Sequence, residues 1–378
     1  MRFSSVKLNE LFHRVTSGGK FVPEIDGLRF VAIAAVIAYH LNGTLVRYYN
    51  LRLPSLPAIL LLNGERGVWL FFVISGFILA LPFASHRLRG TPAPDLKHYF
   101  LRRLTRLEPP YVINILICGL LLFVVNHVAL ASLLPHLLAS LLYSHTFFYG
   151  DLSTINPVTW SLEVEVQFYL TMPLLALVFA VRKDWARRII LVAAMVISAV
   201  AQILWAHSFR SQFSIAYFIQ FFLAGFLLAD LRLSYADSDK KWWWDALSVM
   251  GWPIVFLMEG PMLRVALPFV IIVLYWAAFH GKLANRLFRL PVLTAIGGMC
   301  YTIYLFHFLV IAFASRVLGH NRAPLLLTGV SIGLMAVASS AYFLLIERPC
   351  MDRHWPKKLG AILWPRREQS SADSYPSG

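Results

Sequence analysis

Two ionisable residues stand in an otherwise apolar segment near the N-terminus, "DGLRFVAIAAVIAYH", residues 26–40. Arg29 and His40 are eleven residues apart, so on a helix they share one face, about 16 Å from each other along the axis. An ionisable group inside a membrane span costs about 2.5–3.5 kcal/mol and normally faces a cavity or a partner. The spacing therefore predicts a polar stripe that ends at an imidazole, a group suited to general acid–base catalysis.

Three other apolar segments carry polar groups at a similar predicted depth. "FFVISGF" contributes Ser75, "WSLEVEVQFY" contributes Glu165, and "YTIYLFH" contributes His307 with Tyr304 one turn before it. From the rise per residue of a helix, Ser75, Glu165 and His307 should all lie with His40 in the outer half of the membrane. Four segments that are distant in sequence are thus expected to converge on one polar site.

Simpler structural interpretations remain open for several of these residues. A buried histidine such as His307 is commonly a hydrogen-bonded packing residue, and the Ser75–Gly76 pair can serve close helix contact alone. Glu163 lies two residues before Glu165, so the two carboxylates point in different directions on a helix. We therefore expect no carboxylate dyad, and a solvated Glu163 nearer the interface.

A basic stretch, "KHYFLRRLTR" at residues 97–106, precedes a predicted span. Its Arg103 and Arg106 are expected at the cytoplasmic mouth, where guanidinium groups can bind phosphates or serve only as topology signals. The sequence contains no Walker loop, no HExxH and no nucleophile elbow, and no cluster has the spacing of metal ligands. What remains is suited to acid–base chemistry on a phosphate-bearing substrate.

The composition is that of a membrane protein. Of the 378 residues, 58% are hydrophobic and only 14% are charged, whereas soluble domains have about 25% charged residues. The net charge of +15 arises from Lys and Arg clusters in short loops, as the positive-inside rule produces. This pattern indicates a lipid bilayer rather than nucleic acid as the partner. The three cysteines form no CxxC motif and no even framework.

The apolar blocks predict an all-α, polytopic transmembrane helical bundle of about ten spans with both termini in the cytoplasm. If every basic loop is cytoplasmic, residues 130–150 form a re-entrant or surface-lying segment on the outside. We expect a cytoplasmic N-terminal segment (1–24), an integral membrane domain (25–349) and a cytoplasmic, partly disordered tail (350–378). The predicted spans lie near residues 28–46, 67–84, 110–128, 158–181, 189–206, 213–230, 245–258, 262–280, 292–316 and 324–346.

At these motifs the sequence resembles the acyltransferase family 3 of integral membrane proteins, which O-acylate cell-envelope polysaccharides and related acceptors. The resemblance covers roughly residues 25–349 as an ordered series. One departure is Trp69, which stands where many members have an acidic residue before the "FF" pair. The motif residues are Arg29 and His40 (Arg-x10-His), Ser75 and Gly76 (FF-x-x-SGF), Arg103 and Arg106 (Arg-x-x-Arg), Glu165 (WSL-x-x-E), Tyr304 and His307 (Tyr-Leu-x-His), and the closing "ERP" at 347–349.

The resemblance implies an O-acetyltransferase of the inner (plasma) membrane that uses cytoplasmic acyl-CoA, most simply acetyl-CoA, as co-substrate. The acceptor would be a hydroxyl of an envelope polysaccharide or another glycan, with envelope polysaccharide assembly proteins as further partners and no permanently bound cofactor or metal. His40 would act as general base, supported by Glu165. Donor-binding residues would be Asp26, Arg29, Arg103 and Arg106, and pocket or oxyanion residues Ser75, Trp160, Tyr169, Tyr304 and His307.

Two other classes of function compete with this interpretation. A proton-coupled transporter or flippase of a glycan intermediate could use His40 and Glu165 as a relay, although the sequence has no detectable inverted repeat. A non-catalytic scaffold for polysaccharide assembly would have no use for the buried histidine.

Overall fold

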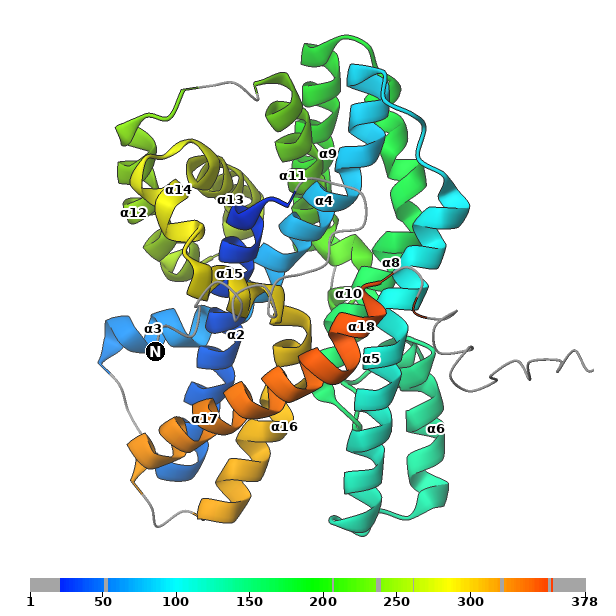
Figure 1. Ribbon diagram of the computed structural model, residues 1–378, viewed down its shortest axis with the longest axis vertical. Coiled ribbons are helices and arrows are strands. Elements are labelled where there is room, and N and C mark those ends of the chain that lie inside the picture. Colours follow the sequence, from blue (N-terminus) through cyan, green and yellow to red (C-terminus); the bar gives the residue numbers. More distant parts are fainter. Residues whose placement is uncertain are drawn as a thin grey trace, which may run out of the picture.

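The computed structural model describes residues 21–50, 54–205, 207–235, 239–260, 262–319, 323–352 and 355. All regular secondary structure within these ranges is helical (Figure 1), which confirms the all-α prediction. Most of the N-terminal segment and of the tail lies outside the described residues, and so do the predictions made for them.

Nine helices in the described part of the chain are long and apolar enough to cross a membrane. The protein is therefore a multi-pass membrane protein. The long helices are α2 (Pro23–Tyr49), α4 (Gly67–Arg89), α5 (Leu96–Val124), α8 (Trp160–Leu175), α9 (Asp184–Trp205), α11 (Ile215–Ser234), α13 (Met262–His280), α16 (Cys300–Leu318) and α17 (Pro324–Tyr342). The 16 residues of α8 are extended by helical turns on both sides into a continuous run of 24 residues, Pro157–Ala180, and this run is the candidate span.

Short helices and turns connect and extend them. The α-helical ones are α3 (Ser55–Leu62), α6 (Leu130–Leu141), α7 (His145–Tyr149), α10 (Phe209–Gln212), α12 (Trp242–Leu257), α14 (Leu283–Phe288), α15 (Pro291–Gly298) and α18 (Arg348–Cys350). The 3₁₀ turns are η1 (Asn63–Arg66), η2 (Pro157–Thr159) and η3 (Ala176–Ala180), and η4 (Phe343–Glu347) is a π-helix.

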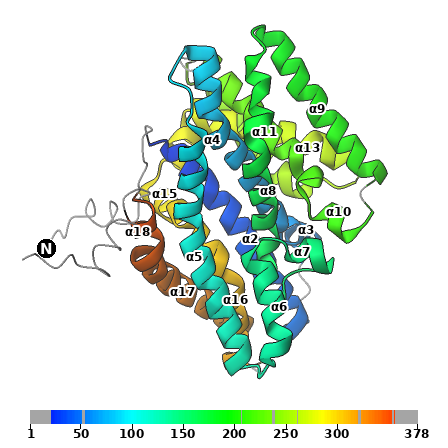
Figure 2. The same cartoon turned by 90° about the vertical axis from the view of Figure 1, so that its right-hand side faces the viewer.

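The count of nine corrects the expectation of about ten spans. The predicted span at 245–258 is α12, which has 16 residues and is about 24 Å long at the rise of an α-helix. That is shorter than the bilayer core of about 30 Å. The segment at 130–150 contains α6, which has 12 residues and also cannot cross; it packs along α5 (Figures 1 and 2).

Two predicted boundaries are wrong. α5 begins at Leu96, so the basic stretch at 97–106 is helical rather than a loop. The reason is a helix cap, because the Asp95 side chain accepts hydrogen bonds from the backbone N–H of Lys97 at 2.8 Å and of His98 at 3.4 Å. The span predicted at 292–316 is divided at Met299 into α15 and α16.

The most extensive helix contact in the bundle joins α4 and α11, which run side by side (Figures 1 and 2). A Cβ on Gly76 would lie 2.2 Å from the Phe222 carbonyl oxygen, and one on Gly225 would lie 2.3 Å from the backbone nitrogen of Phe77. Only glycine permits this approach, as is common where membrane helices cross. The contact holds the helix turn that carries Ser75 deep in the bundle.

The N-terminal end of α2 is held in the same way by α14 and α15. A Cβ on Gly27 would lie 2.1 Å from the Phe288 carbonyl oxygen, and one on Gly297 would lie 1.7 Å from the Asp26 carbonyl oxygen. These backbone contacts fix the first turns of α2, and with them the position of Arg29.

We predict that Gly225→Ala lowers the free energy of unfolding by about 1–3 kcal/mol or more, because the new methyl group meets backbone atoms that cannot move aside. Gly333→Ala in α17 is the matched control, since nothing lies within 4 Å of its Cβ position. Thermal unfolding in detergent measures both. An unchanged melting temperature for Gly225→Ala would contradict the described α4–α11 contact.

Candidate active site

The imidazoles of His40 on α2 and His307 on α16 lie next to each other. Their ring centroids are 4.9 Å apart at an interplanar angle of 51°. His307 is 0% exposed, whereas His40 is partly buried between the rings of Tyr39 and Phe308. The first and the last of the predicted site segments thus meet at a histidine pair.

The hydrogen bonds of His307 determine which of its nitrogens carries the proton. Its Nδ1 lies 2.6 Å from the Tyr304 carbonyl oxygen, which can only accept, so Nδ1–H donates. In the neutral ring Nε2 is then an acceptor, and it is buried without a hydrogen-bond partner among the described residues. An orphan buried acceptor costs about 1–3 kcal/mol, and this one belongs to a ring that faces His40.

A second pair joins α4 to α8. The Ser75 hydroxyl donates to Glu165 Oε1 at 2.7 Å, and Glu165 also interacts with the Tyr169 hydroxyl one turn further along α8. No hydrogen bond or ion pair between Glu165 and His40 is present among the described residues. The carboxylate is therefore held by hydroxyl groups rather than by the imidazole.

Tyr304 lies between the two pairs. Its hydroxyl donates to the Val158 carbonyl oxygen at 2.7 Å and lies 2.6 Å from the Ser161 hydroxyl oxygen. The Tyr304 ring is 5.5 Å from the His307 ring, centroid to centroid, and its hydroxyl is within electrostatic range of Glu165. Segments α2, α4, α8 and α16 thus meet around one polar cluster.

A cavity of about 430 Å³ between α5 and α8 reaches this cluster. Three residues predicted for the site line it: Arg103, Glu165 and Tyr169. The Arg103 guanidinium carbon lies 5.6 Å from the ring centroid of Tyr99 and 5.9 Å from that of Tyr169, in the range of cation–π contacts. A cationic group and a partly buried carboxylate therefore share one largely apolar cavity.

Arg29 has a different environment. Its NH1 lies 2.5 Å from Asp26 Oδ1, and the two residues are 9% and 2% exposed. The charge of Arg29 is thus offset by a buried carboxylate within the same helix. Arg106, one turn after Arg103 on α5, is half-buried and does not line the 430 Å³ cavity.

Two further residues of interest on α8 are Glu163 and Trp160. Glu163 was expected to be solvated, but it is 1% exposed, because its Oε2 accepts the backbone N–H of Thr146 at 3.0 Å. The segment at 130–150 covers it, which spacing along α8 could not reveal. Trp160 packs against Phe213 and Phe218, in an aromatic group beside the polar cluster.

Several residues of the cavity and cluster were not singled out from the sequence. Glu108 and Tyr143 both line the cavity and interact with each other. Ser161 supports Tyr304, and Tyr301 lines the cavity while its hydroxyl donates to the Leu107 carbonyl oxygen at 3.0 Å. The only signal for Glu108, Ser161 and Tyr301 was their position inside the motifs "RLEPP", "WSLE" and "YTIY", which did not distinguish them from packing residues, and Tyr143 lies in none of these motifs.

We predict that Ser75→Ala and Glu165→Ala are energetically coupled by about 1 kcal/mol or more in a double-mutant cycle of unfolding, because they share a partly buried hydrogen bond to a charged group. Ser198→Ala on α9 is the control partner, since its hydroxyl bonds only to its own helix at the Ala194 and Met195 carbonyl oxygens. Additive effects of Ser75→Ala and Glu165→Ala would show that the bond contributes nothing.

Comparison with known proteins identifies the family of this chain. A family model described as an acyltransferase domain matches residues 22–345. O-acetyltransferase OatA of Staphylococcus aureus (strain COL) is 26% identical over 383 residues, covering 90% of this chain and 60% of that protein. A second protein of the same strain, provisionally named an O-acetyltransferase, is 23% identical over 363 residues, covering 87% of this chain and 57% of its own length.

This chain therefore spans a little under two thirds of the length of these relatives. No solved structure shows significant similarity to it. The match of the family model extends over nearly all of the helical bundle, including each of the four segments that meet at the polar cluster. The chain belongs to the acyltransferase family 3.

Proposed function

We propose that the protein is an O-acetyltransferase of the plasma membrane that moves an acetyl group from cytoplasmic acetyl-CoA to a hydroxyl of an envelope glycan. Membership of the family and the names of the two relatives support the reaction type. The observation that carries the proposal is the histidine pair, in which the partly exposed ring of His40 lies 4.9 Å, centroid to centroid, from the buried ring of His307, whose Nε2 has no hydrogen-bond partner among the described residues.

The donor enters through the 430 Å³ cavity. Lys97 and Arg103 line it together with Glu165 and Tyr169, so the phosphates of the donor bind at the basic residues while the pantetheine arm follows the apolar lining toward α8. Arg103 is the principal phosphate ligand. Arg29, whose charge is offset by Asp26, contributes less to donor affinity, and Asp26 acts by holding Arg29.

His40 takes the proton of the acceptor hydroxyl as the oxygen attacks the thioester carbon. A carbon–oxygen bond forms, the carbon–sulfur bond breaks, and the proton on His40 passes to the leaving thiolate, so that CoA departs as the thiol. When substrate binds, the His40 N–H donates to Nε2 of His307, which has no other partner among the described residues, and this bond orients the His40 ring. The N–H of His307 is used by the Tyr304 carbonyl oxygen, so His307 positions the base and does not donate to the oxyanion.

Ser75 and Tyr304, which the sequence suggested as donors to the oxyanion, also have their hydrogens engaged in other bonds. The Ser75 hydroxyl donates to Glu165, and the Tyr304 hydroxyl donates to the Val158 carbonyl oxygen. Each hydroxyl has a single hydrogen, so neither can donate elsewhere while these bonds persist. Ser75 and Tyr304 therefore shape the site, and Glu165 fixes the hydroxyl groups around the cavity.

We predict that His40→Ala lowers acetyl transfer at least about 100-fold, because the proton acceptor is lost. Transfer of labelled acetyl groups from acetyl-CoA to envelope glycan measures this, with NMR of the glycan to identify the acetylated hydroxyl. His207→Ala, on an exposed turn, is the control and keeps wild-type transfer. Near-normal transfer by a folded His40→Ala protein would end this mechanism, and transport of glycan without acetylation would favour the flippase.

We also predict that Arg103→Gln weakens binding of acetyl-CoA about ten-fold or more, since a charge-assisted contact to phosphate contributes about 1.5–3 kcal/mol. Arg102→Gln is the matched control: this neighbouring arginine is exposed and its Nε bonds to the His98 carbonyl oxygen. Calorimetry with the purified protein gives both dissociation constants. Equal affinities for the two variants would exclude the cavity as the donor site.

A further inference from the structure

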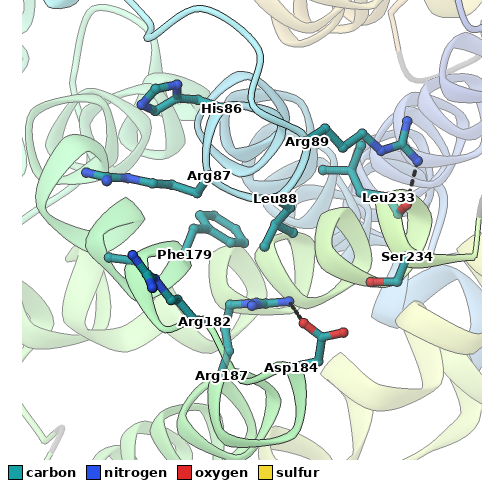
Figure 3. Close-up of a pocket in the computed structure, with 11 residues that line it drawn as sticks. His86, Arg87, Leu88, Arg89, Phe179, Arg182, Asp184, Arg187, Leu233 and Ser234 are labelled. Carbon is teal, nitrogen blue, oxygen red and sulfur yellow. Dashed lines mark hydrogen bonds and ion pairs between the residues drawn. The ribbon is translucent and has the colours of Figure 1, made fainter.

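A second, basic pocket of about 650 Å³ lies where α4, η3, α9 and α11 come together (Figure 3). It shares no lining residue with the cavity that holds Arg103 and Glu165. None of the family motifs described above lies in it. Its lining residues are His86, Arg87, Leu88, Arg89, Phe179, Ala180, Arg182, Asp184, Arg187, Leu233 and Ser234.

Buried ion pairs build the wall of this pocket. Arg187 is 0% exposed and forms ion pairs with Asp230 on α11 and with Asp184, the latter at 2.9 Å. Arg188 bonds to the other oxygen of Asp230 at 2.7 Å. These contacts lock α9 to α11, so the pocket is a fixed feature of the fold.

The guanidinium groups at the rim are not neutralised. Arg89 donates to the Leu233 carbonyl oxygen at 2.5 Å, an uncharged partner. Arg87 and Arg182 have no hydrogen-bond or ionic partner within the part of the chain that the structure describes. Figure 3 shows their side chains extending to the same side of the pocket, beside Phe179.

The exposed arginines Arg87, Arg89 and Arg182 give the pocket a local excess of positive charge, which favours the binding of an anion. Four arginines line it against one acidic residue, Asp184, and that carboxylate is already paired with Arg187. Like charges held together in a concave site repel each other, and an anion that enters relieves this repulsion. Guanidinium groups match the geometry of phosphate oxygens through two parallel hydrogen bonds.

We propose that this pocket binds a phosphate-bearing ligand through Arg87 and Arg182. The neighbouring residues place it at a membrane surface, because Trp185 is 63% exposed with Lys183 over its ring at 6.0 Å, an arrangement typical of the headgroup region. The phosphate can come from the headgroup of an anionic phospholipid or from a soluble phosphate ester. The proposal does not rest on the acetyltransferase reaction.

The test uses the full chain in nanodiscs and has two arms. In the first, native mass spectrometry measures retention of phosphatidylglycerol from a background of phosphatidylcholine. In the second, calorimetry measures binding of adenosine 3′,5′-bisphosphate in phosphatidylcholine nanodiscs alone. We expect the wild-type protein to bind at least one probe, and the double variant Arg87→Gln/Arg182→Gln to bind that probe about ten-fold more weakly or worse.

The matched control is Lys282→Gln/Arg286→Gln, which removes the same charge from exposed positions outside the pocket. If binding depends on this pocket rather than on the net charge of the protein, the control variant retains wild-type binding of the probe. Loss of phosphatidylglycerol alone identifies a lipid site, and loss of the bisphosphate alone a site for a soluble ester. If the double variant fails to fold, Arg182→Gln alone is measured in the same way. The proposal is overturned if neither probe binds the wild-type protein, or if the pocket and control variants bind equally.

Discussion

A carboxylate that lies between membrane-spanning helices is costly unless the protein supplies hydrogen-bond partners for its oxygens. Glu165 receives the Ser75 hydroxyl at 2.7 Å and interacts with Tyr169. The first contact ties α8 to α4, and α4 is itself fixed against α11 by the glycine contact at Gly76. The position of the candidate site thus follows from the need to satisfy one partly buried charge within the bundle.

The same requirement explains how far sequence could predict the site. The rise per residue of a helix gives the depth of a side chain, and it correctly brought His40, Ser75, Glu165 and His307 to segments that meet. Depth alone does not give direction around the bundle axis. The pairing of His40 with His307 and of Ser75 with Glu165, rather than His40 with Glu165, depends on how four helices pack, and no property of a single helix contains that information.

The errors in the fold have equally local causes. Hydropathy finds apolar blocks but does not distinguish a span from a helix that is too short, so α12 was counted as a crossing. The start of α5 was predictable in principle, because Asp95 is a favourable N-cap, but the charge of residues 97–106 suggested a loop. The burial of Glu163 by the segment that includes α7 is a tertiary contact, and spacing along α8 gives no indication of it.

The hydrogen-bond inventory also constrains the chemistry of transfer. Three polar hydrogens of the cluster already have an acceptor: Ser75 donates to Glu165, Tyr304 to Val158, and His307 to Tyr304. Stabilisation of a developing oxyanion requires donors, so these three groups can serve only if a substrate exchanges one of the bonds when it binds. The Ser161 and Tyr304 pair is best suited to this exchange, because two hydroxyls 2.6 Å apart can reverse donor and acceptor roles without moving either helix. The rearrangement expected on substrate binding is therefore a rotation of hydroxyl hydrogens and not a movement of the bundle.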